Sequence, residues 1–387
     1  MRVEEIVEYA DGLYHDTEFS AAREWREKNG GAKAVGYLPI YAPRELIDAA
    51  GMLPVGLLGG RGLIEIIRGD AYYQSYICQI PRSTIELALS GKYDFMDGFL
   101  FPSTCDVIRN LSGVWKVLFP NKYAHYVDVP QNFDKAIGGK YFQRELTHIR
   151  KDLETLSGRA VTDDDLRRSI ARYNENRHAI NELWELRSAQ PWRALATESY
   201  LVMYAGCMLP VEEHTKLVRE YVAAVKQAER PMRDNARVVI SGAFCEQPPL
   251  GLIRTLEMAG CYIVWDDMSL GRRWFEADVS LEGDPIEALS DAFIQHSVTT
   301  AVKYEPHIDR TIPLRRLVEK NRAEGVVFAA PSFCDPALLE QPMLTQTLDR
   351  AGIPWTAFKY AENLGQFQVI REQAGTFADS IKLWSDT

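Results

Sequence analysis

Two short segments of the sequence repeat the same order of residues around a cysteine. The first, FLFPSTCD, covers residues 99–106, and the second, FAAPSFCD, covers residues 328–335. Each is an apolar run followed by Pro-Ser-x-Cys-Asp, which predicts a buried strand that ends at a proline and then turns. A cysteine that only fills a core does not need this arrangement twice. Cys105 and Cys334 are therefore candidate metal ligands or nucleophiles, and the alternative is that both are inert thiols.

Four further cysteines complete the set of six. Cys78 precedes a helix predicted to start at Pro81, and a helix N-terminus stabilises a thiolate. Cys245, in SGAFCEQP, also follows a predicted strand and is the main rival ligand. Cys207 falls in a helical stretch and Cys261 at the start of a strand, so we predict that both are core thiols. No pair has CxxC spacing, which excludes the common zinc-ribbon and thioredoxin patterns.

Several familiar chemical motifs are missing from the sequence. It contains no GxxxxGK[ST] P-loop, no GxSxG nucleophile elbow and no HExxH zinc motif. Residues 55–62 (VGLLGGRG) are rich in glycine but lack the GxGxxG order, so we interpret them as a loop and not as a dinucleotide cradle. His178 falls on a predicted helix, where we expect a surface residue and not a ligand.

The composition of the 387 residues is that of a globular protein, with 46% hydrophobic and 25% charged residues. This length predicts roughly two or three domains. A net charge of −10 argues against a nucleic-acid-binding surface. No stretch approaches the ~18 apolar residues of a membrane span, and the acidic N-terminus is unlike a secretory signal. We therefore expect a cytoplasmic protein, in which structural disulfides are disfavoured.

The first third of the sequence alternates between helix and strand patterns. Residues 43–50 predict a helix that Gly51 ends, and residues 52–58 predict a strand. A second helix is predicted at 81–89 and a second strand at 98–101. This succession is typical of a parallel α/β layer.

The middle of the sequence is charged and helical. Residues 143–189 have helical periodicity, and TDDD at 162–165 predicts an N-cap with an acidic first turn. Residues 196–228 continue this helical pattern. After residue 235, strands alternate with helices again. The predicted strands are 237–241, 262–265, 326–330 and 354–358, and the predicted helices are 250–259, 285–294, 314–323 and 336–351.

These patterns predict an α/β fold with two doubly wound parallel-sheet domains, Rossmann-like or flavodoxin-like. We place the first domain, with its N-terminal helices, at 1–142, a helical connector at 143–234 and the second domain at 235–387. Pro-Ser-x-Cys-Asp then follows a strand in each domain, at the carboxyl edge where open α/β sheets bind their ligands.

Four segments carry a resemblance to a known family. They are LPIYAPRELIDAAGMLPV (38–55), YICQIPRSTIELALSGKYDFMDGFLFPSTCDVIRNL (76–111), DDMSLGRR (266–273) and PSFCDP (331–336). Together they resemble the 2-hydroxyacyl-CoA dehydratase and benzoyl-CoA reductase family over nearly the whole chain. The length and PSTCDVIRNL are most similar to substrate-side (B/C-type) subunits of the ATP-dependent reductase branch. DDMSLGRR departs from the cysteine-containing version of many dehydratases.

The resemblance implies a [4Fe-4S] cluster held by Cys78, Cys105 and Cys334, with one iron left for a non-protein ligand. It also implies a homologous sister subunit and ATP-hydrolysing iron-sulfur activator subunits that receive electrons from ferredoxin. The implied reaction is the reduction of an aromatic acyl-CoA, benzoyl-CoA, to a cyclohexadienoyl-CoA in anaerobic aromatic degradation. The alternative within the family is a subunit of a 2-hydroxyacyl-CoA dehydratase. Outside the family, the alternative is a cluster-free two-domain protein that binds a small ligand.

Other side chains near these segments are secondary candidates, and none identifies itself as a catalytic proton donor. Ser103, Thr104 and Ser332 could donate hydrogen bonds to cluster sulfur, or could cap the helices that follow. Candidates for an apolar substrate cleft, or for ordinary core, are Tyr72, Tyr73, Tyr76, Phe101 and Phe333. Polar candidates are Arg82, Arg109, Asn110, Asp266 and Arg272. Of these, Arg109 and Arg272 could meet CoA phosphates or could be surface charges.

Overall fold

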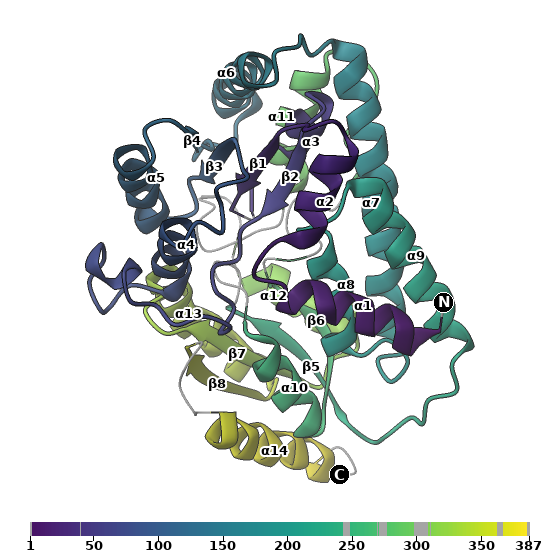
Figure 1. Cartoon of the computed structure of the whole chain (residues 1–387). Coiled ribbons are helices and arrows are strands. Elements are labelled where there is room, and N and C mark those ends of the chain that lie inside the picture. The colour runs from purple at the N-terminus through teal and green to yellow at the C-terminus, as the bar shows by residue number, and fades with distance from the viewer. Residues whose placement is uncertain are drawn as a thin grey trace.

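The computed structural model of the chain describes residues 2–38, 40–242, 248–268, 270, 277–297, 309, 311–361 and 367–384. The strands of this part form two four-stranded sheets in which all neighbouring strands are parallel. Figure 1 shows the two sheets in different halves of the molecule, surrounded by helices. The predicted fold class, an α/β fold with two parallel sheets, is confirmed.

The first sheet has the strand order β2-β1-β3-β4. Its strands are β1 (Ala34–Tyr37), β2 (Leu53–Gly56), β3 (Gly98–Pro102) and β4 (Tyr123–Val127). The sequence predicted β2 and β3 but missed the other two. β1 has only four residues, one of which is Gly36, and glycine weakens a strand pattern. β4 is an edge strand of mostly half-buried residues that includes His125, so it lacks an apolar run.

The second sheet has the order β6-β5-β7-β8. Its strands are β5 (Ala236–Ser241), β6 (Cys261–Asp266), β7 (Gly325–Pro331) and β8 (Trp355–Tyr360). All four overlap the predicted strands. The two central strands, β5 and β7, were predictable because central parallel strands are buried on both faces and read as continuous apolar runs, as β7 does with every residue buried.

The two sheets share one topology. In each, the first strand of the sheet lies between the second and the third, and the fourth lies beside the third. Between the first and third strands the strand order reverses, and open α/β sheets bind ligands at such a switch point. β3 ends at Pro102 and β7 at Pro331, so both Pro-Ser-x-Cys-Asp segments leave the third strand of their sheet.

Helices surround both sheets (Figure 1). The first part of the chain forms α1 (Val3–His15), α2 (Ser20–Lys28), α3 (Arg44–Ala49), α4 (Gln79–Leu89) and α5 (Asp106–Leu118), with a short 3-10 turn η1 (Gly69–Ala71). The middle of the chain forms a π-helical turn η2 (Lys135–Gly139), α6 (Lys140–Ser157), α7 (Asp163–Ala189), α8 (Ala196–Ala205) and α9 (Val211–Gln227). The last are α10 (Leu250–Met258), α11 (Pro285–His296), α12 (Thr311–Lys320), α13 (Asp335–Ala351) and α14 (Phe367–Trp384).

The helical pattern predicted at 196–228 is divided in the structure. α8 ends at Ala205, and α9 begins at Val211 after Pro210, its N-cap residue. Gly206 and Pro210 explain the break, because glycine favours a helix end and proline disrupts a helix interior. No helix in the described part of the chain is both long enough and apolar enough to cross a bilayer.

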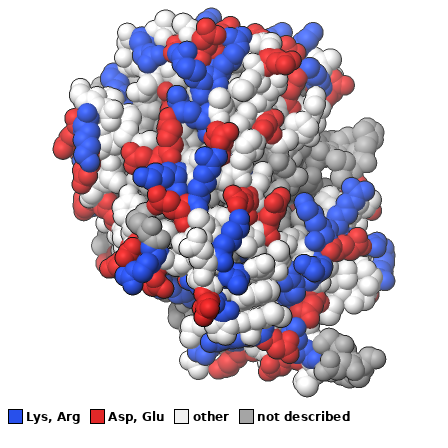
Figure 2. All heavy atoms as spheres, turned by 90° about the vertical axis from the view of Figure 1, so that its right-hand side faces the viewer, with Lys and Arg blue, Asp and Glu red and all other residues white. Residues whose placement is uncertain are grey.

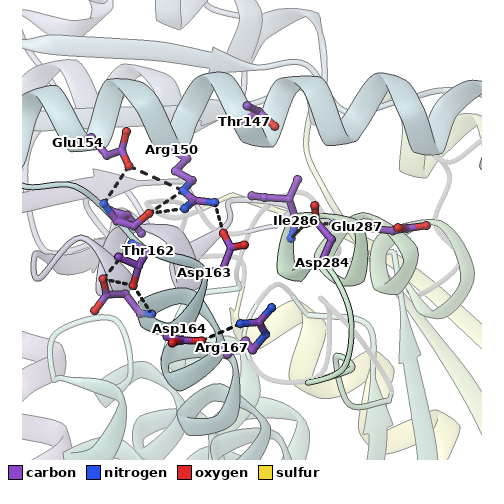
Figure 3. Close-up of polar contacts among 12 residues, drawn as sticks. Thr147, Arg150, Glu154, Thr162, Asp163, Asp164, Arg167, Asp284, Ile286 and Glu287 are labelled. Carbon is purple, nitrogen blue, oxygen red and sulfur yellow. Dashed lines mark hydrogen bonds and ion pairs between the residues drawn. The ribbon is translucent and has the colours of Figure 1, made fainter.

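The turn between α6 and α7 has the capping that the sequence predicted (Figure 3). Thr162 Oγ1 accepts a hydrogen bond from the backbone N–H of Asp165 at 3.1 Å, and the Asp165 carboxylate accepts one from the N–H of Thr162 at 2.9 Å. This capping box satisfies two N–H groups that the start of a helix leaves unpaired. Arg150 of α6 also pairs with Asp163 at 2.7 Å and thereby fixes the angle between the two helices.

Helix α7 connects the two sheets through buried ion pairs. Near the first sheet, Arg177 donates to Glu45 of α3 at 2.9 Å, and both side chains are buried. At its other end, Arg187 pairs with Asp266, the last residue of β6 in the second sheet. Burying such a pair is costly unless both partners are present, so each pair fixes the position of α7 relative to one sheet.

The outer face of α7 and α9 carries charges of both signs. Arg172 pairs with Glu212 at 3.0 Å, and Lys226 pairs with Glu182 at 2.5 Å. On this side of the molecule, Figure 2 shows basic and acidic groups interleaved and no large patch of either sign. Exposed pairs of this kind contribute about 0–1 kcal/mol each, so this face provides solubility more than stability.

Helix α11 packs on the core of the first sheet although it comes from the later part of the sequence. The ring of its Phe293 lies 4.8 Å from that of Phe142 and 5.1 Å from that of Tyr41, measured between centroids. The strands of the first sheet fall within residues 1–142 and those of the second within 235–387. The domain boundaries at these positions stay a prediction.

Candidate functional site

The three predicted ligands occupy the same structural position. Cys78 is the N-cap residue of α4, Cys105 of α5 and Cys334 of α13. In Figure 1 these three helices lie on the same side of the molecule. The N-terminus of a helix has unpaired N–H groups and a positive dipole end, which favours a thiolate or another anion. This arrangement places each cysteine at the partly positive end of a helix dipole.

Cys105 has the most fully determined surroundings of the three. Burial raises the pKa of its thiol, the backbone N–H groups of Ile108 and Val107 oppose this rise, and the nearby Cys334 adds to it. This effect indicates that charge on Cys334 of the second sheet's segment acts on Cys105 of the first. A metal would reverse this effect, because a bound cation stabilises thiolates.

Tyr73 connects Cys78 to the same region. Burial raises the pKa of the Tyr73 hydroxyl, and negative charge on Cys78 and then on Cys105 adds to the rise. Cys105 therefore interacts electrostatically with Cys334, and both Cys78 and Cys105 with Tyr73. That the three thiols meet at one site stays a prediction.

The donor types in this region fit an iron-sulfur cluster. Thiols are the ligands that select Fe–S clusters, zinc and copper(I). Cys334 is buried, whereas Cys78 and Cys105 are partly exposed. Among the described residues, no three His, Cys, Asp or Glu side chains are close enough to hold a single metal ion. A cluster binds its cysteines through different irons and so needs them farther apart. Cys245, the rival ligand, lies outside the described residues.

The two Pro-Ser-x-Cys-Asp segments begin identically. The backbone N–H of Ser103 donates to the carbonyl of Val127 at 2.9 Å, and that of Ser332 donates to the carbonyl of Tyr360 at 2.7 Å. In both cases the acceptor is the last residue of the neighbouring fourth strand. Each serine therefore extends its sheet by one hydrogen bond before the chain turns towards the cysteine.

After the serine, the two segments differ. The N–H of Cys334 donates to the carbonyl of Pro331 at 3.1 Å, and Phe333 between them has a φ of 72°. These are the features of a type II turn, in which the position of Phe333 favours glycine. Phe333 is 53% exposed, whereas Thr104 at the equivalent position is buried. A bulky residue in this strained conformation is uncommon and often marks a functional site.

The serine and threonine hydroxyls do not cap the helices that follow. The N-cap residues are the cysteines, and neither α5 nor α13 has a side-chain cap hydrogen bond. Ser103 Oγ accepts from the N–H of Val129 at 2.9 Å and also contacts the hydroxyl of Tyr126. The alternative that Ser103 caps the following helix is therefore wrong, because its hydroxyl bonds Val129 and Tyr126 instead of α5.

The five candidate aromatic residues have different environments. Phe101 is fully buried, with its ring centroid 5.4 Å from that of Trp115, so it belongs to the core. Tyr73 is half-buried and packs against the same core. The remaining three are exposed: Tyr72, Tyr76 and Phe333.

The polar candidates also separate by environment. Arg82 is mostly buried and pairs with Asp70 at 2.9 Å. Arg109 is exposed and pairs with Asp106 at 3.5 Å, and Asn110 is exposed as well. Arg109 thus stays available to a ligand phosphate, and Arg272 lies outside the described residues. His178, expected at the surface, is about half exposed and bonds Asp278 at 2.8 Å.

Sequence reasoning missed the partner of Asp266. The carboxylate of Asp266 accepts from Arg187, whose guanidinium lies 3.6 Å from the ring centre of Trp184. These side chains border a cavity of about 20 Å³, room for about one water molecule, beneath the carboxyl end of β6. Nothing in the spacing of α7 indicates the pair, because Arg187 is followed by no acid within reach on its own helix.

The two remaining described cysteines are core residues, as predicted. Cys207 is 3% exposed and Cys261 is fully buried. Burial raises the pKa of each thiol to about 12, which keeps both protonated at neutral pH. A protonated buried thiol is a poor nucleophile and a poor metal ligand.

The chain is similar to known proteins over nearly its whole length. The model of the family described as 2-hydroxyglutaryl-CoA dehydratase, D-component, matches residues 39–381. The chain is 55% identical to the C-type subunit of the benzoyl-CoA reductase of Thauera aromatica over 386 residues, which cover 100% of each chain. It is 28% identical to the (R)-phenyllactyl-CoA dehydratase beta subunit of Clostridium sporogenes, over 91% of this chain and 92% of that one. It is 29% identical to the beta subunit of the (R)-2-hydroxyglutaryl-CoA dehydratase of Acidaminococcus fermentans, over 92% and 94%.

Proposed function

Because the chain belongs to the 2-hydroxyglutaryl-CoA dehydratase D-component family, we propose that it is a subunit of an ATP-dependent reductase that acts on an aromatic acyl-CoA, benzoyl-CoA. The similarity to the C-type subunit of benzoyl-CoA reductase is the observation that favours a reductase over a dehydratase. That identity is roughly twice the identity to the dehydratase subunits and extends over both complete chains. A dehydratase subunit is the second candidate.

We propose that Cys78, Cys105 and Cys334 hold a [4Fe-4S] cluster. When bound, such a cluster would supply single electrons at low potential, in a range that reaches roughly −700 mV. The N-cap position of each cysteine supports this proposal, since helix N-termini favour thiolates. Three protein thiolates leave one iron for a non-protein ligand, as catalytic zinc sites leave one position open.

The proposed reaction adds two electrons and two protons to the ring of benzoyl-CoA and gives a cyclohexadienoyl-CoA. Adding the first electron is very unfavourable, so the site must be dry and must stabilise the developing anion. The exposed side chains of Tyr72, Tyr76 and Phe333 lie on the segments that carry the thiols and offer apolar surface for this purpose. We assign no proton donor.

The function requires partner proteins. The relatives are named as subunits, which supports a homologous sister subunit beside this chain. The sequence has no P-loop, whereas low-potential reduction needs an energy input. We therefore propose that separate ATP-hydrolysing iron-sulfur subunits, reduced by ferredoxin, deliver the electrons.

Anaerobic turnover of the reconstituted complex tests this proposal. Benzoyl-CoA and a 2-hydroxyacyl-CoA are supplied separately, with ATP, with a reductant and in matched reactions that lack ATP. Loss of the aromatic absorbance of benzoyl-CoA, coupled to ATP hydrolysis, is the expected result. Formation of an enoyl-CoA from the hydroxy ester, with benzoyl-CoA unchanged, would instead establish the dehydratase. A colourless, iron-free complex that binds a small molecule would establish the cluster-free alternative.

A further inference from the structure

One buried polar group beside the proposed cluster ligands lacks a hydrogen-bond partner. The hydroxyl of Tyr73 is shielded from solvent and has no partner among the described residues. Its ring packs against the hydrophobic core, whereas the neighbouring Tyr72 is 40% exposed. Buried hydroxyls are almost always hydrogen-bonded, because an unpaired one loses its hydration without compensation. The Tyr73 hydroxyl is therefore a buried donor that has no acceptor among the described residues.

The segment before Tyr73 is fixed on helix α4. One carboxylate oxygen of Glu86 on α4 accepts hydrogen bonds from three consecutive backbone N–H groups, those of residues 67–69. Arg82, one turn earlier on α4, pairs with Asp70 of the same segment. Because Cys78 is the N-cap of α4, these contacts set the position of the segment relative to the Cys78 sulfur.

The same segment packs very closely against α4. A Cβ atom at Gly69 would lie only 2.1 Å from the carbonyl oxygen of Arg82, so no other residue fits there. Tyr73 follows only four residues later. This close packing limits the movement by which the Tyr73 hydroxyl could reach water.

The Tyr73 hydroxyl interacts electrostatically with two of the proposed ligands. Charges on Cys78 and Cys105 both act on Tyr73, and burial keeps its pKa above the ordinary tyrosine value. The group is therefore a hydrogen-bond donor at neutral pH. Sulfur atoms of thiolates and of Fe–S clusters accept hydrogen bonds, and such bonds tune the reduction potential of the metal centre.

We propose that the Tyr73 hydroxyl donates a hydrogen bond to a sulfur atom of the group held between Cys78 and Cys105, and thereby raises its reduction potential. This inference rests on the proposed function, since it takes the cluster as bound. The reduced cluster carries one more negative charge than the oxidised one, so a donor stabilises the reduced form more. Tyr73 is thus a positioning and tuning residue, not a catalytic one.

The test is a redox titration of the anaerobically purified complex, followed by electron paramagnetic resonance of the cluster in this chain. Tyr73→Phe removes only the hydroxyl, and Tyr72→Phe is the matched control on the adjacent exposed ring. We expect Tyr73→Phe to lower the reduction potential by ~59 mV. This shift corresponds to a tenfold change in the equilibrium constant of a one-electron reduction. Tyr72→Phe should leave the potential unchanged. An unshifted potential in Tyr73→Phe, or an equal shift in both variants, would overturn the inference.

A second substitution covers the case in which Tyr73→Phe assembles no cluster. 3-Fluorotyrosine at position 73 keeps the ring and makes the hydroxyl a stronger donor that is still protonated at neutral pH, so the potential should rise. A fall or no change would contradict the proposed hydrogen bond. A wild-type complex without any cluster in this chain would overturn the proposed ligand set and this inference together. If the wild-type complex holds the cluster and neither substitution changes its reduction potential, the inference alone would be overturned.

Discussion

Cys105 and Cys334 occupy equivalent positions in two sheets of identical strand order. Each is the N-cap of the helix that follows the third strand, one residue after a threonine or phenylalanine and two after a serine that extends the sheet. The chain thus contains the same strand–turn–helix unit twice, with the thiol at the same point of each. Charge on Cys334 acts on Cys105, which supports the proposal that the two units contribute to one shared cluster.

The proposed ligand set predicts which thiols the cluster needs. Cys334→Ala should reduce the iron content and the visible absorbance of the anaerobically purified protein to a small fraction of the wild-type value. Cys261→Ala is the matched control, because Cys261 is buried in β6 with a pKa of about 12. Full iron content in Cys334→Ala, or bleaching in Cys261→Ala, would refute the ligand set.

The positive φ of Phe333 predicts that a substitution by glycine stabilises the protein. A non-glycine residue in this conformation costs about 1–2 kcal/mol, and glycine costs about 0.5–1 kcal/mol in unfolded-state entropy. Since Phe333 is 53% exposed and loses few contacts, Phe333→Gly should raise the free energy of unfolding by up to ~1 kcal/mol. Thr104→Gly, at the equivalent buried position, should lower it. Denaturant titration of both variants measures these changes. A lower free energy of unfolding in Phe333→Gly than in the wild type would argue against strain in the turn.

The buried pair between α7 and β6 predicts a large loss when one partner is removed. Arg187→Leu leaves the Asp266 carboxylate buried without its partner, so the free energy of unfolding should fall by about 3–5 kcal/mol. Arg187→Leu combined with Asp266→Asn should recover part of this loss. Lys226→Met, which breaks the half-exposed pair with Glu182, should cost less than about 1 kcal/mol. Equal losses in Arg187→Leu and Lys226→Met would show that the buried pair has no special role.

The buried His214 predicts a loss of stability in acid. Burial lowers its pKa to about 4, its Nδ1 accepts from Asn176 at 3.0 Å, and its Nε2 bonds the carbonyl of Val202 at 3.1 Å. The unfolded chain binds a proton near pH 6.5, whereas the folded one does not until about pH 4. Stability is therefore full above pH 6.5 and falls as the pH drops towards 4, by about 3 kcal/mol in total.

His214→Gln should remove this part of the acid dependence, because glutamine keeps the two hydrogen bonds and does not titrate. Unfolding free energies measured at several pH values between 4 and 7 give the difference between variant and wild type. His178→Gln, at an exposed site, should retain the acid loss. An unchanged slope in His214→Gln would show that other groups cause it.

The sequence predicted those features that depend on local patterns. The second sheet was readable because its strands are apolar runs such as GVVFAAP, and the N-cap at Thr162 was readable from TDDD. β1 and β4 were missed because Gly36 interrupts the interior of β1, while His125 interrupts the apolar pattern of β4. The break between α8 and α9 was also missed, although Gly206 and Pro210 are a signal for it.

The candidate site also combines features that local sequence patterns indicate with features that they do not. The positions of Cys78 and Cys334 before helices follow from local signals, such as Pro336 in the first turn of α13. The hydrogen bonds from residues 67–69 to Glu86 and the pairing of Arg187 with Asp266 join distant parts of the chain. Such contacts arise only when the sheets and α7 pack together, so no spacing in a single sequence indicates them.

The most direct test of the proposed ligand set is the location of iron in the complex. Anomalous scattering at the iron absorption edge, from crystals grown without oxygen, gives this location without reference to activity. We predict one four-iron peak in this chain, bonded to the sulfurs of Cys78, Cys105 and Cys334. A peak bonded to Cys245 in place of one of these, or no iron in this chain at all, would contradict the proposal.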